Sequence, residues 1–216
     1  MDDIYMSETE EKGWYYASAR FSEEPFRPYV VAIGQSALAW NSLQEALGGV
    51  FWVLMGGRGL GVWQSLTADR PKRDMLEAAL LNMPETFHEA YPKAKADLTW
   101  LTTNTMKLED ARNNVMHAPL QLTAPLKAFQ VRDPKTGGPS KRKIPAGATV
   151  VPHDWQQNKR ALRLTGKDIL AEFRVCHARA IALRDYANFL VHAFRMPNAS
   201  WPDRPRLPVR PVASKN

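Results

Sequence analysis

Two long stretches of the chain repeat apolar residues at alternating steps of three and four, and this repeat limits the possible folds more than composition does. The first repeat runs from Val30 to Leu54, and the second runs from Ile169 to Phe194. Such spacing places the apolar side chains along one stripe of an α-helix. A long helix with one apolar stripe is stable when the stripe packs against other helices. The sequence therefore predicts two long helices in a bundle.

Proline and polar residues mark further helices between these two. A short helix is expected over 60–66, and the Asp69 to Pro71 step should start another that continues to residue 83. The next helical element opens at Pro84 and continues through residue 118, where Pro119 stops it because proline disfavours helical geometry in the residue before it. Thr165 is the expected N-cap of the last long helix.

The glycine-rich stretch "MGGRGLGVW", residues 55–63, follows the first long helix. It invites comparison with a phosphate-binding loop, but no strand precedes it and no Gly-Lys-Ser/Thr is present. A helix–helix turn is the favoured interpretation. In the preceding helix, the glycine pair at 48–49 either weakens the helix locally or lets another segment approach closely.

Residues 120–160 differ in composition from the predicted helices. β-Branched residues flank the turn sequence "DPKTGG", residues 133–138, which is typical of a two-stranded hairpin, with a mobile basic flap as the alternative. Residues 132–143 carry five bases and one acid, including the run Lys141, Arg142 and Lys143. This segment is predicted to be a basic β insertion before the last long helix.

Charge is unevenly distributed along the 216 residues. Residues 1–24 hold seven acids and two bases, a net of −5, so the rest of a chain whose net charge is +7 carries +12. A basic body suits a polyanionic partner such as nucleic acid, and a solvated surface without a ligand is the alternative.

Length and residue usage favour one soluble domain with 44% hydrophobic residues. The single cysteine, Cys176, lies on the last apolar stripe and is interpreted as a buried thiol in a reducing compartment. The acidic N-terminus is not a secretory signal, and the most apolar stretch, residues 30–55, contains too many polar residues for a membrane span. We expect a cytoplasmic protein that does not associate with a membrane.

One arginine lies on an apolar stripe. Before Pro119 the stripe runs through Leu98, Leu101, Thr105, Leu108, position 112 and Val115, and position 112 is arginine. A charge on a buried stripe is costly unless it is paired or faces an interface or ligand. Arg112 therefore requires an explanation that a surface arginine would not.

Two polar residues follow closely on the same helix. Asn113 and His117 are four residues apart, so they share one helix face. Arg112 and His117 are roughly 140° apart around the axis, although a long arginine near a helix end can fold toward the same pocket. His117 lies in the last turn, where the helix dipole favours a positive charge. A positively charged imidazole beside a guanidinium suits a phosphate better than a divalent metal.

The segment "RNNVMH", Arg112 to His117, resembles the Arg-x4-6-His motif of HEPN domains, in a similar setting near the end of a long helix ahead of a final long helix. The resemblance covers about residues 28–195. It implies an all-α, HEPN-like bundle over residues 25–195 with the β insertion at 120–160. The flanking segments are an acidic, extended segment, 1–24, and a basic, proline-rich tail, 196–216.

HEPN proteins are commonly homodimers, and many are metal-independent endoribonucleases in toxin or defence systems. The resemblance implies that Arg112 neutralises the scissile phosphate, that His117 acts as general acid or base, and that Asn113 orients His117 or binds the phosphate. Lys141, Arg142 and Lys143 would attract RNA by charge. No metal or cofactor is expected.

Two alternatives remain open at this level. The protein could be a non-catalytic, HEPN-like dimeric module that binds a protein, a nucleotide or RNA. It could also be a structural protein in which residues 112–117 only anchor the next loop. Of the tryptophans, Trp40, Trp52 and Trp100 are expected in the core, and Trp201 in the tail is expected to contact the core or another subunit.

Overall fold

The computed structural model describes residues 14–17, 27–56, 59–117, 120–132, 139–145, 149–152, 159–164, 167–196 and 198–209. The predicted turn at 133–138, Pro119, Thr165 and most of the acidic segment 1–24 lie outside the described residues. The chain divides into two compact units, residues 1–32 with 113–172 and residues 33–112 with 173–216. The division falls inside three long helices.

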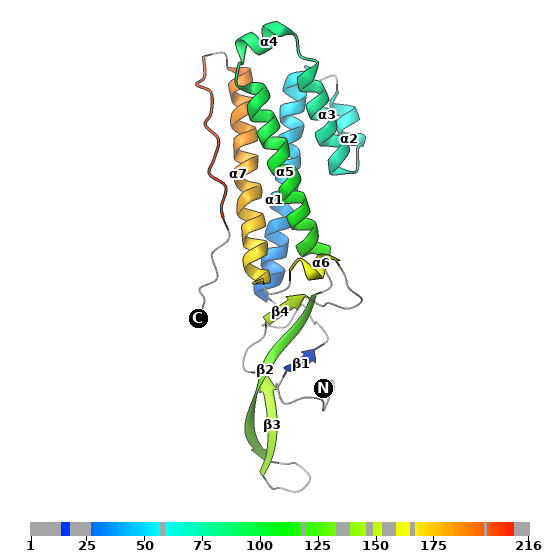
Figure 1. The fold of residues 1–216 in the computed structure, drawn as a ribbon, viewed down its shortest axis with the longest axis vertical. Helices are drawn as coiled ribbons and strands as arrows, with labels where there is room; N and C mark the ends of the chain where they lie inside the picture. The colour runs from blue at the N-terminus through cyan, green and yellow to red at the C-terminus, as the bar shows by residue number, and fades with distance from the viewer. Residues whose placement is uncertain are drawn as a thin grey trace. The chain divides into compact units, whose positions relative to one another are not determined.

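The second unit is a helical bundle, and this prediction is confirmed. In Figure 1 the long helices lie side by side, with shorter helices beside them and at one end of the bundle. The helices of the chain that contribute to it are α1 (Arg27–Met55), α2 (Leu60–Ser65), α3 (Asp69–Leu81), α4 (Glu85–Ala90), α5 (Ala94–His117) and α7 (Ile169–Arg195).

Contacts along the bundle show how the long helices run. Ser36 Oγ donates a hydrogen bond of 2.9 Å to the carbonyl of Phe173 near the start of α7, and Trp52 meets Arg195 near its end. The helices α1 and α7 are therefore parallel. The helix α5 is antiparallel to both, because its early residue Trp100 packs edge-on against Tyr186 late in α7.

The predicted apolar stripes form the core of the bundle. Leu43, Leu47 and Val50 of α1 and Leu183 and Leu190 of α7 have no exposed surface. Burying each such side chain stabilises the fold by roughly 1.5–3 kcal/mol before conformational entropy is counted. The two periodic patterns in the sequence thus correspond to helices that meet in one core.

Close packing at glycines positions α2 against α1. A Cβ atom at Gly48 would lie 2.7 Å from Trp63 Nε1, so only glycine lets the indole lie this close to α1. The same indole stacks on Phe51 with ring centroids 5.2 Å apart. Gly56, with φ of 60°, occupies the left-handed region where a glycine ends a helix at low cost. Gly56 and Gly59, the described residues between α1 and α2, are turn residues, which agrees with the predicted helix–helix turn.

The helix boundaries predicted from the sequence were wrong at two places. The element expected from residue 84 onward is two helices, because the chain turns at Tyr91–Lys93, where Pro92 interrupts the helical hydrogen bonds. The last long helix begins later than expected, at Ile169, and Asp168 is its N-cap because Asp168 Oδ1 accepts the Ala171 N–H at 3.0 Å.

One of the three tryptophans expected in the core is exposed. Trp40 is buried and Trp100 is half-buried, whereas Trp52 has 43% of its surface exposed. Trp52 lies one position beyond the buried pair Val50 and Phe51, so it points away from the stripe. Within the described residues, no helix is both long and apolar enough to cross a membrane.

Where the structure describes the first unit outside the long helices, it shows four strands and a short helix. The strand β2 (Leu120–Arg132) pairs antiparallel with β1 (Trp14–Ala17), β3 (Pro139–Pro145) and β4 (Thr149–Pro152). Its first half lies between β1 and β4, and its second half pairs with β3 alone, from Leu126 opposite Pro145 to Arg132 opposite Pro139. The short helix α6 (Lys159–Leu162) precedes α7.

Candidate functional site

The stripe that carries Arg112 is present in α5. Leu98, Leu101, Thr105 and Leu108 have at most 2% of their surface exposed, and Arg112 is half-buried. The helix continues without a break to His117, as the spacing predicts. The boundary between the two units falls directly after Arg112, so Arg112 belongs to the bundle unit, and Asn113 and His117 belong to the first unit.

Arg112 lies over an aromatic ring of a neighbouring helix. Its guanidinium carbon is 5.2 Å from the ring centroid of Trp40 on α1, which is within the range of a cation–π interaction. The Trp40 ring is 97% buried, and its Nε1 donates a 3.1 Å hydrogen bond to Asp69 Oδ2 on α3. The hydrogen bond fixes the indole, and the indole in turn supports the guanidinium.

A buried ion pair joins the same helices one turn away. The Arg73 guanidinium on α3 pairs with the Glu109 carboxylate on α5, and their side chains are 7% and 20% exposed. Breaking a pair in such a setting costs about 3–5 kcal/mol, because one charge remains buried without compensation. We refer to Trp40, Asp69, Arg73, Glu109 and Arg112 as the Arg112 cluster.

The Arg112 guanidinium has a defined position over the Trp40 ring. An arginine guanidinium can donate two parallel hydrogen bonds to a phosphate or a carboxylate. Within the Arg112 cluster, Asp69 accepts a hydrogen bond from Trp40, and Glu109 forms an ion pair with Arg73.

The other motif residues belong to the first unit. Asn113 is half-buried, and His117 is exposed in the last turn of α5. Asn114, to which the motif assigns no role, accepts a 3.4 Å hydrogen bond from Arg163 Nη1. The His117 side chain is thus accessible to solvent.

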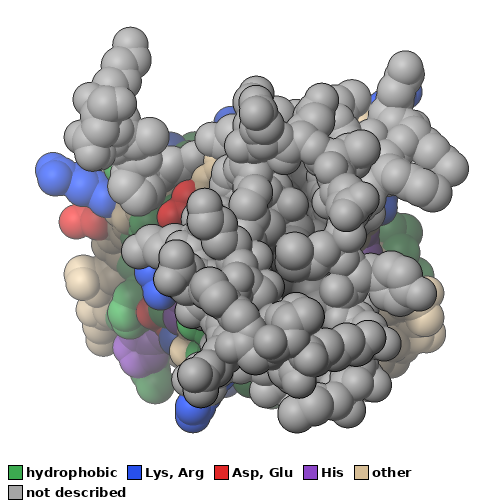
Figure 2. Space-filling view, turned by 90° about the horizontal axis from the view of Figure 1, so that it is seen from below, with side chains coloured by type: hydrophobic (Ala, Val, Ile, Leu, Met, Phe, Trp, Pro, Cys, Tyr) green, Lys and Arg blue, Asp and Glu red, His purple; other side chains and the backbone are tan. Residues whose placement is uncertain are grey.

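The three basic residues predicted to bind RNA lie on β3. Lys141, Arg142 and Lys143 stand opposite residues 130, 129 and 128 of β2. Their side chains lie outside the described set. In the face shown in Figure 2, the described lysine and arginine side chains are mixed with acidic and hydrophobic ones.

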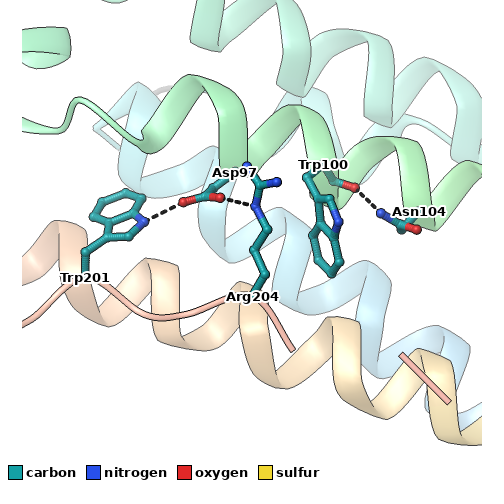
Figure 3. Close-up of polar contacts among 5 residues, drawn as sticks. All are labelled: Asp97, Trp100, Asn104, Trp201 and Arg204. Carbon is teal, nitrogen blue, oxygen red and sulfur yellow. Dashed lines mark hydrogen bonds and ion pairs between the residues drawn. The ribbon is translucent and has the colours of Figure 1, made fainter. Parts of the chain in front are cut away.

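A second polar cluster holds the C-terminal segment, residues 198–209, against the bundle. Figure 3 shows Asp97 of α5 between Trp201 and Arg204 of this segment. Asp97 is 5% exposed, accepts a 2.6 Å hydrogen bond from Trp201 Nε1, and pairs with the Arg204 guanidinium. Further along, Arg179 Nε donates a 2.7 Å hydrogen bond to the Pro208 carbonyl.

Aromatic rings complete the attachment of this segment. The Trp201 ring lies 5.4 Å from Phe194 and 6.0 Å from Tyr91, measured between centroids. Burial raises the pKa of Tyr186 well above its ordinary value, and the nearby Asp97 carboxylate raises this pKa further. Trp201 therefore contacts the bundle of its own chain, which is one of the two alternatives that its position in the tail left open.

Sequence reasoning missed most partners of these charged residues. Trp40 was assigned to the core from its stripe position, and nothing in the sequence connects it with Arg112, which is 72 positions away. Nothing in the sequence marked Asp97 as a contact of the C-terminal segment, because a carboxylate beside an apolar stripe is usually solvated. The one signal that could be read was the arginine on the stripe of α5.

Among the residues that the structure describes, no three His, Cys, Asp or Glu side chains lie together as metal ligands would. No protein-family model matches the sequence, and no curated protein or solved structure is significantly similar to the chain.

Proposed function

We propose that this protein is a metal-independent endoribonuclease of HEPN type that acts as a homodimer in a toxin or defence role. The observation that carries the proposal is Arg112, a charged residue on the buried stripe of α5 whose guanidinium is held over the Trp40 ring. The continuous helix up to the exposed His117 supports the same proposal, because the motif needs both residues near one helix end.

The chemistry requires a fixed cation and a group that moves protons. The ribose 2′-hydroxyl attacks the adjacent phosphorus, the bond to the 5′-oxygen breaks, and the products are a 2′,3′-cyclic phosphate and a 5′-hydroxyl. Arg112 would neutralise the charge that develops on the phosphate oxygens. His117 would transfer a proton at one of the two oxygens, and Asn113 would orient it or bind the phosphate.

Lys141, Arg142 and Lys143 would bring RNA to this site through contacts to phosphates. Such contacts release counterions, so binding should weaken steeply as salt is raised. Two copies of the chain would present two such sites, which is the arrangement that the homodimer implies.

The test is cleavage of a mixed RNA substrate by pure protein in excess EDTA. We expect cyclic phosphate ends, and we expect His117→Ala to abolish cleavage while leaving the melting temperature unchanged, because His117 is exposed. Asn114→Ala is the matched control and should cleave normally. Sedimentation should show a dimer for the native protein and both variants. Intact RNA after incubation with dimeric, folded protein would refute the nuclease.

A second function is favoured by the same cation–π contact. A guanidinium stacked on a buried tryptophan also stabilises the bundle, which suits a non-catalytic dimeric module that binds a protein, a nucleotide or RNA. In that case Arg112→Ala lowers the melting temperature, and binding of any of these ligands persists in His117→Ala. The His117→Ala variant distinguishes the two functions, because only the nuclease requires His117 to transfer a proton.

A further inference from the structure

Prolines recur at every third position of the C-terminal segment. Pro202, Pro205 and Pro208 show this spacing, and the segment forms neither an α-helix nor a strand. A polyproline II helix has three residues per turn, so prolines three positions apart share one of its faces. The spacing therefore suits an extended segment whose side chains fall on three lengthwise faces.

The exposure of the side chains repeats with the same period. Asp203, Arg206 and Val209 are exposed and share one face, whereas the three prolines of a second face are half-buried. The third face carries Trp201 and Arg204, and both of these side chains contact α5. The segment thus presents one face to solvent and packs on the bundle with the other two.

The bundle surface beneath the segment combines one acid with aromatic rings. Asp97 lies between Trp201 and Arg204 in Figure 3, and Trp100 lies beside Arg204. The Arg204 guanidinium is 5.8 Å from the centroid of the Trp100 ring, which is within reach of a cation–π interaction. Polyproline II segments are commonly recognised by aromatic surfaces. We refer to Tyr91, Asp97, Trp100, Arg179 and Phe194 as the Asp97 surface.

Side chains make the attachment between the segment and the Asp97 surface. Among the described residues, no hydrogen bond joins the backbone of 201–209 to the backbone of a helix. The segment is held by its contacts to Asp97 and Arg179 and by the rings around Trp201. A segment with few buried contacts and no secondary structure opens locally at a lower free energy than the core. Opening leaves the Asp97 surface free to receive another segment of the same kind.

Every copy of the chain carries both the Asp97 surface and the segment that fits it. The acid Asp97 and the base Arg204 make any two copies complementary in charge. An exchanged segment regains the contacts that were lost on opening, so exchange between two copies has a low free-energy cost. The connection after α7 contains a turn in which the Ala199 N–H donates to the Met196 carbonyl at 2.9 Å. Opening this turn moves the segment away, while α7 keeps its own hydrogen bonds.

We infer that the Asp97 surface binds the C-terminal segment of a second copy of this chain, so that two copies exchange residues 198–209. The inference rests on the homodimer of the proposed function, for which it supplies the contact surface. It requires neither Arg112 nor RNA, so exchange can be tested apart from cleavage.

The first test is sedimentation velocity of the full chain over a range of concentrations. The exchanged dimer should appear as the native protein is concentrated, because the segment of the same chain competes at a high effective concentration. The double variant Trp201→Ala/Arg204→Ala loses both contacts to Asp97 and should stay monomeric. Asp203→Ala, on the exposed face, is the matched control and should dimerise like the native protein.

The second test mixes two chains that cannot bind their own segments. Asp97→Ala keeps an intact segment, and the double variant keeps an intact Asp97 surface. Mass spectrometry of a mixture with isotope-labelled Asp97→Ala protein follows trypsin cleavage after Arg206 of that chain alone. We expect the double variant to slow this cleavage at least about fivefold, because cleavage depends on the fraction of free segment. Labelled Asp203→Ala protein already binds its own segment, so mixing should leave its cleavage unchanged.

The outcomes separate exchange from the proposed ribonuclease. A dimer that persists in the double variant would overturn the inference and assign the homodimer to another surface. Unchanged cleavage in the mixture would also overturn it, provided that circular dichroism shows both chains folded, with Asp97→Asn replacing an Asp97→Ala protein that fails to fold. Slower cleavage in the mixture together with intact RNA in the EDTA assay would support exchange and refute the nuclease.

Discussion

Replacing Trp201 by phenylalanine tests whether Asp97 attaches the C-terminal segment to the bundle. The substitution removes the indole N–H that donates to Asp97 Oδ2 at 2.6 Å, and it keeps an aromatic ring beside Phe194 and Tyr91. The carboxylate retains its ion pair with Arg204. The change therefore isolates one hydrogen bond to a buried, charged acceptor.

The expected loss follows from the chemistry of that bond. Hydrogen bonds to charged groups contribute about 1.5–3 kcal/mol to stability, against about 0.5–1.5 kcal/mol for neutral pairs. For a chain of this length, 1 kcal/mol corresponds to roughly 2–4 °C in melting temperature. Trp201→Phe should thus lower the melting temperature by about 3–12 °C. In an Asp97→Asn background the same substitution should cost about half as much, because the acceptor is then neutral.

Two measurements check this reasoning. Calorimetry gives the melting temperature, and limited trypsin digestion reports the segment itself, because cleavage after Arg206 requires the segment to leave the bundle. Trp52→Phe is the control, since Trp52 is exposed and has an arginine rather than a carboxylate beside it. It should change stability by less than about 0.5 kcal/mol. A Trp201→Phe protein with native melting temperature and native digestion rate would refute the proposed attachment.

Two other outcomes follow from the packing of the bundle. Gly48→Ala should destabilise the protein by about 1–2 kcal/mol despite the better helix propensity of alanine, because the new Cβ would lie 2.7 Å from Trp63 Nε1. Gly34→Ala places its Cβ where no atom lies within 4 Å, so it should stabilise the protein by up to about 1 kcal/mol. Urea unfolding of the two variants compares these free energies. Tyr186 has a raised pKa in the folded state, so its contribution to stability is complete below about pH 10 and falls as pH rises further, since the unfolded state releases its phenolic proton first. Tyr186→Phe should therefore show a shallower fall of melting temperature with alkaline pH, and identical slopes would contradict the assignment.

The periodic features of the sequence predicted the bundle well. The stripes of α1 and α7 needed only the recurrence of apolar residues, because the period of a helix is a local property of the backbone. The same logic identified Arg112 as an exception, and the structure places it half-buried at the expected point of α5. The break at Pro92 was missed because a proline is tolerated in the first turn of a helix, and the sequence does not distinguish that position from a true break.

The sequence by itself determined the helix positions, the turn after Met55 and the unusual arginine on the apolar stripe of α5. Helix propensity, apolar periodicity and glycine geometry act over only a few neighbouring residues, so they can be read without the tertiary structure. The partners of the charged and amide groups do not follow from it. Trp40 beneath Arg112, Asp97 beneath Trp201 and the buried amide of Gln44 each depend on helices that meet from distant parts of the chain. Packing decides these contacts, because the direction of a side chain across an interface depends on how two helices are rotated against each other.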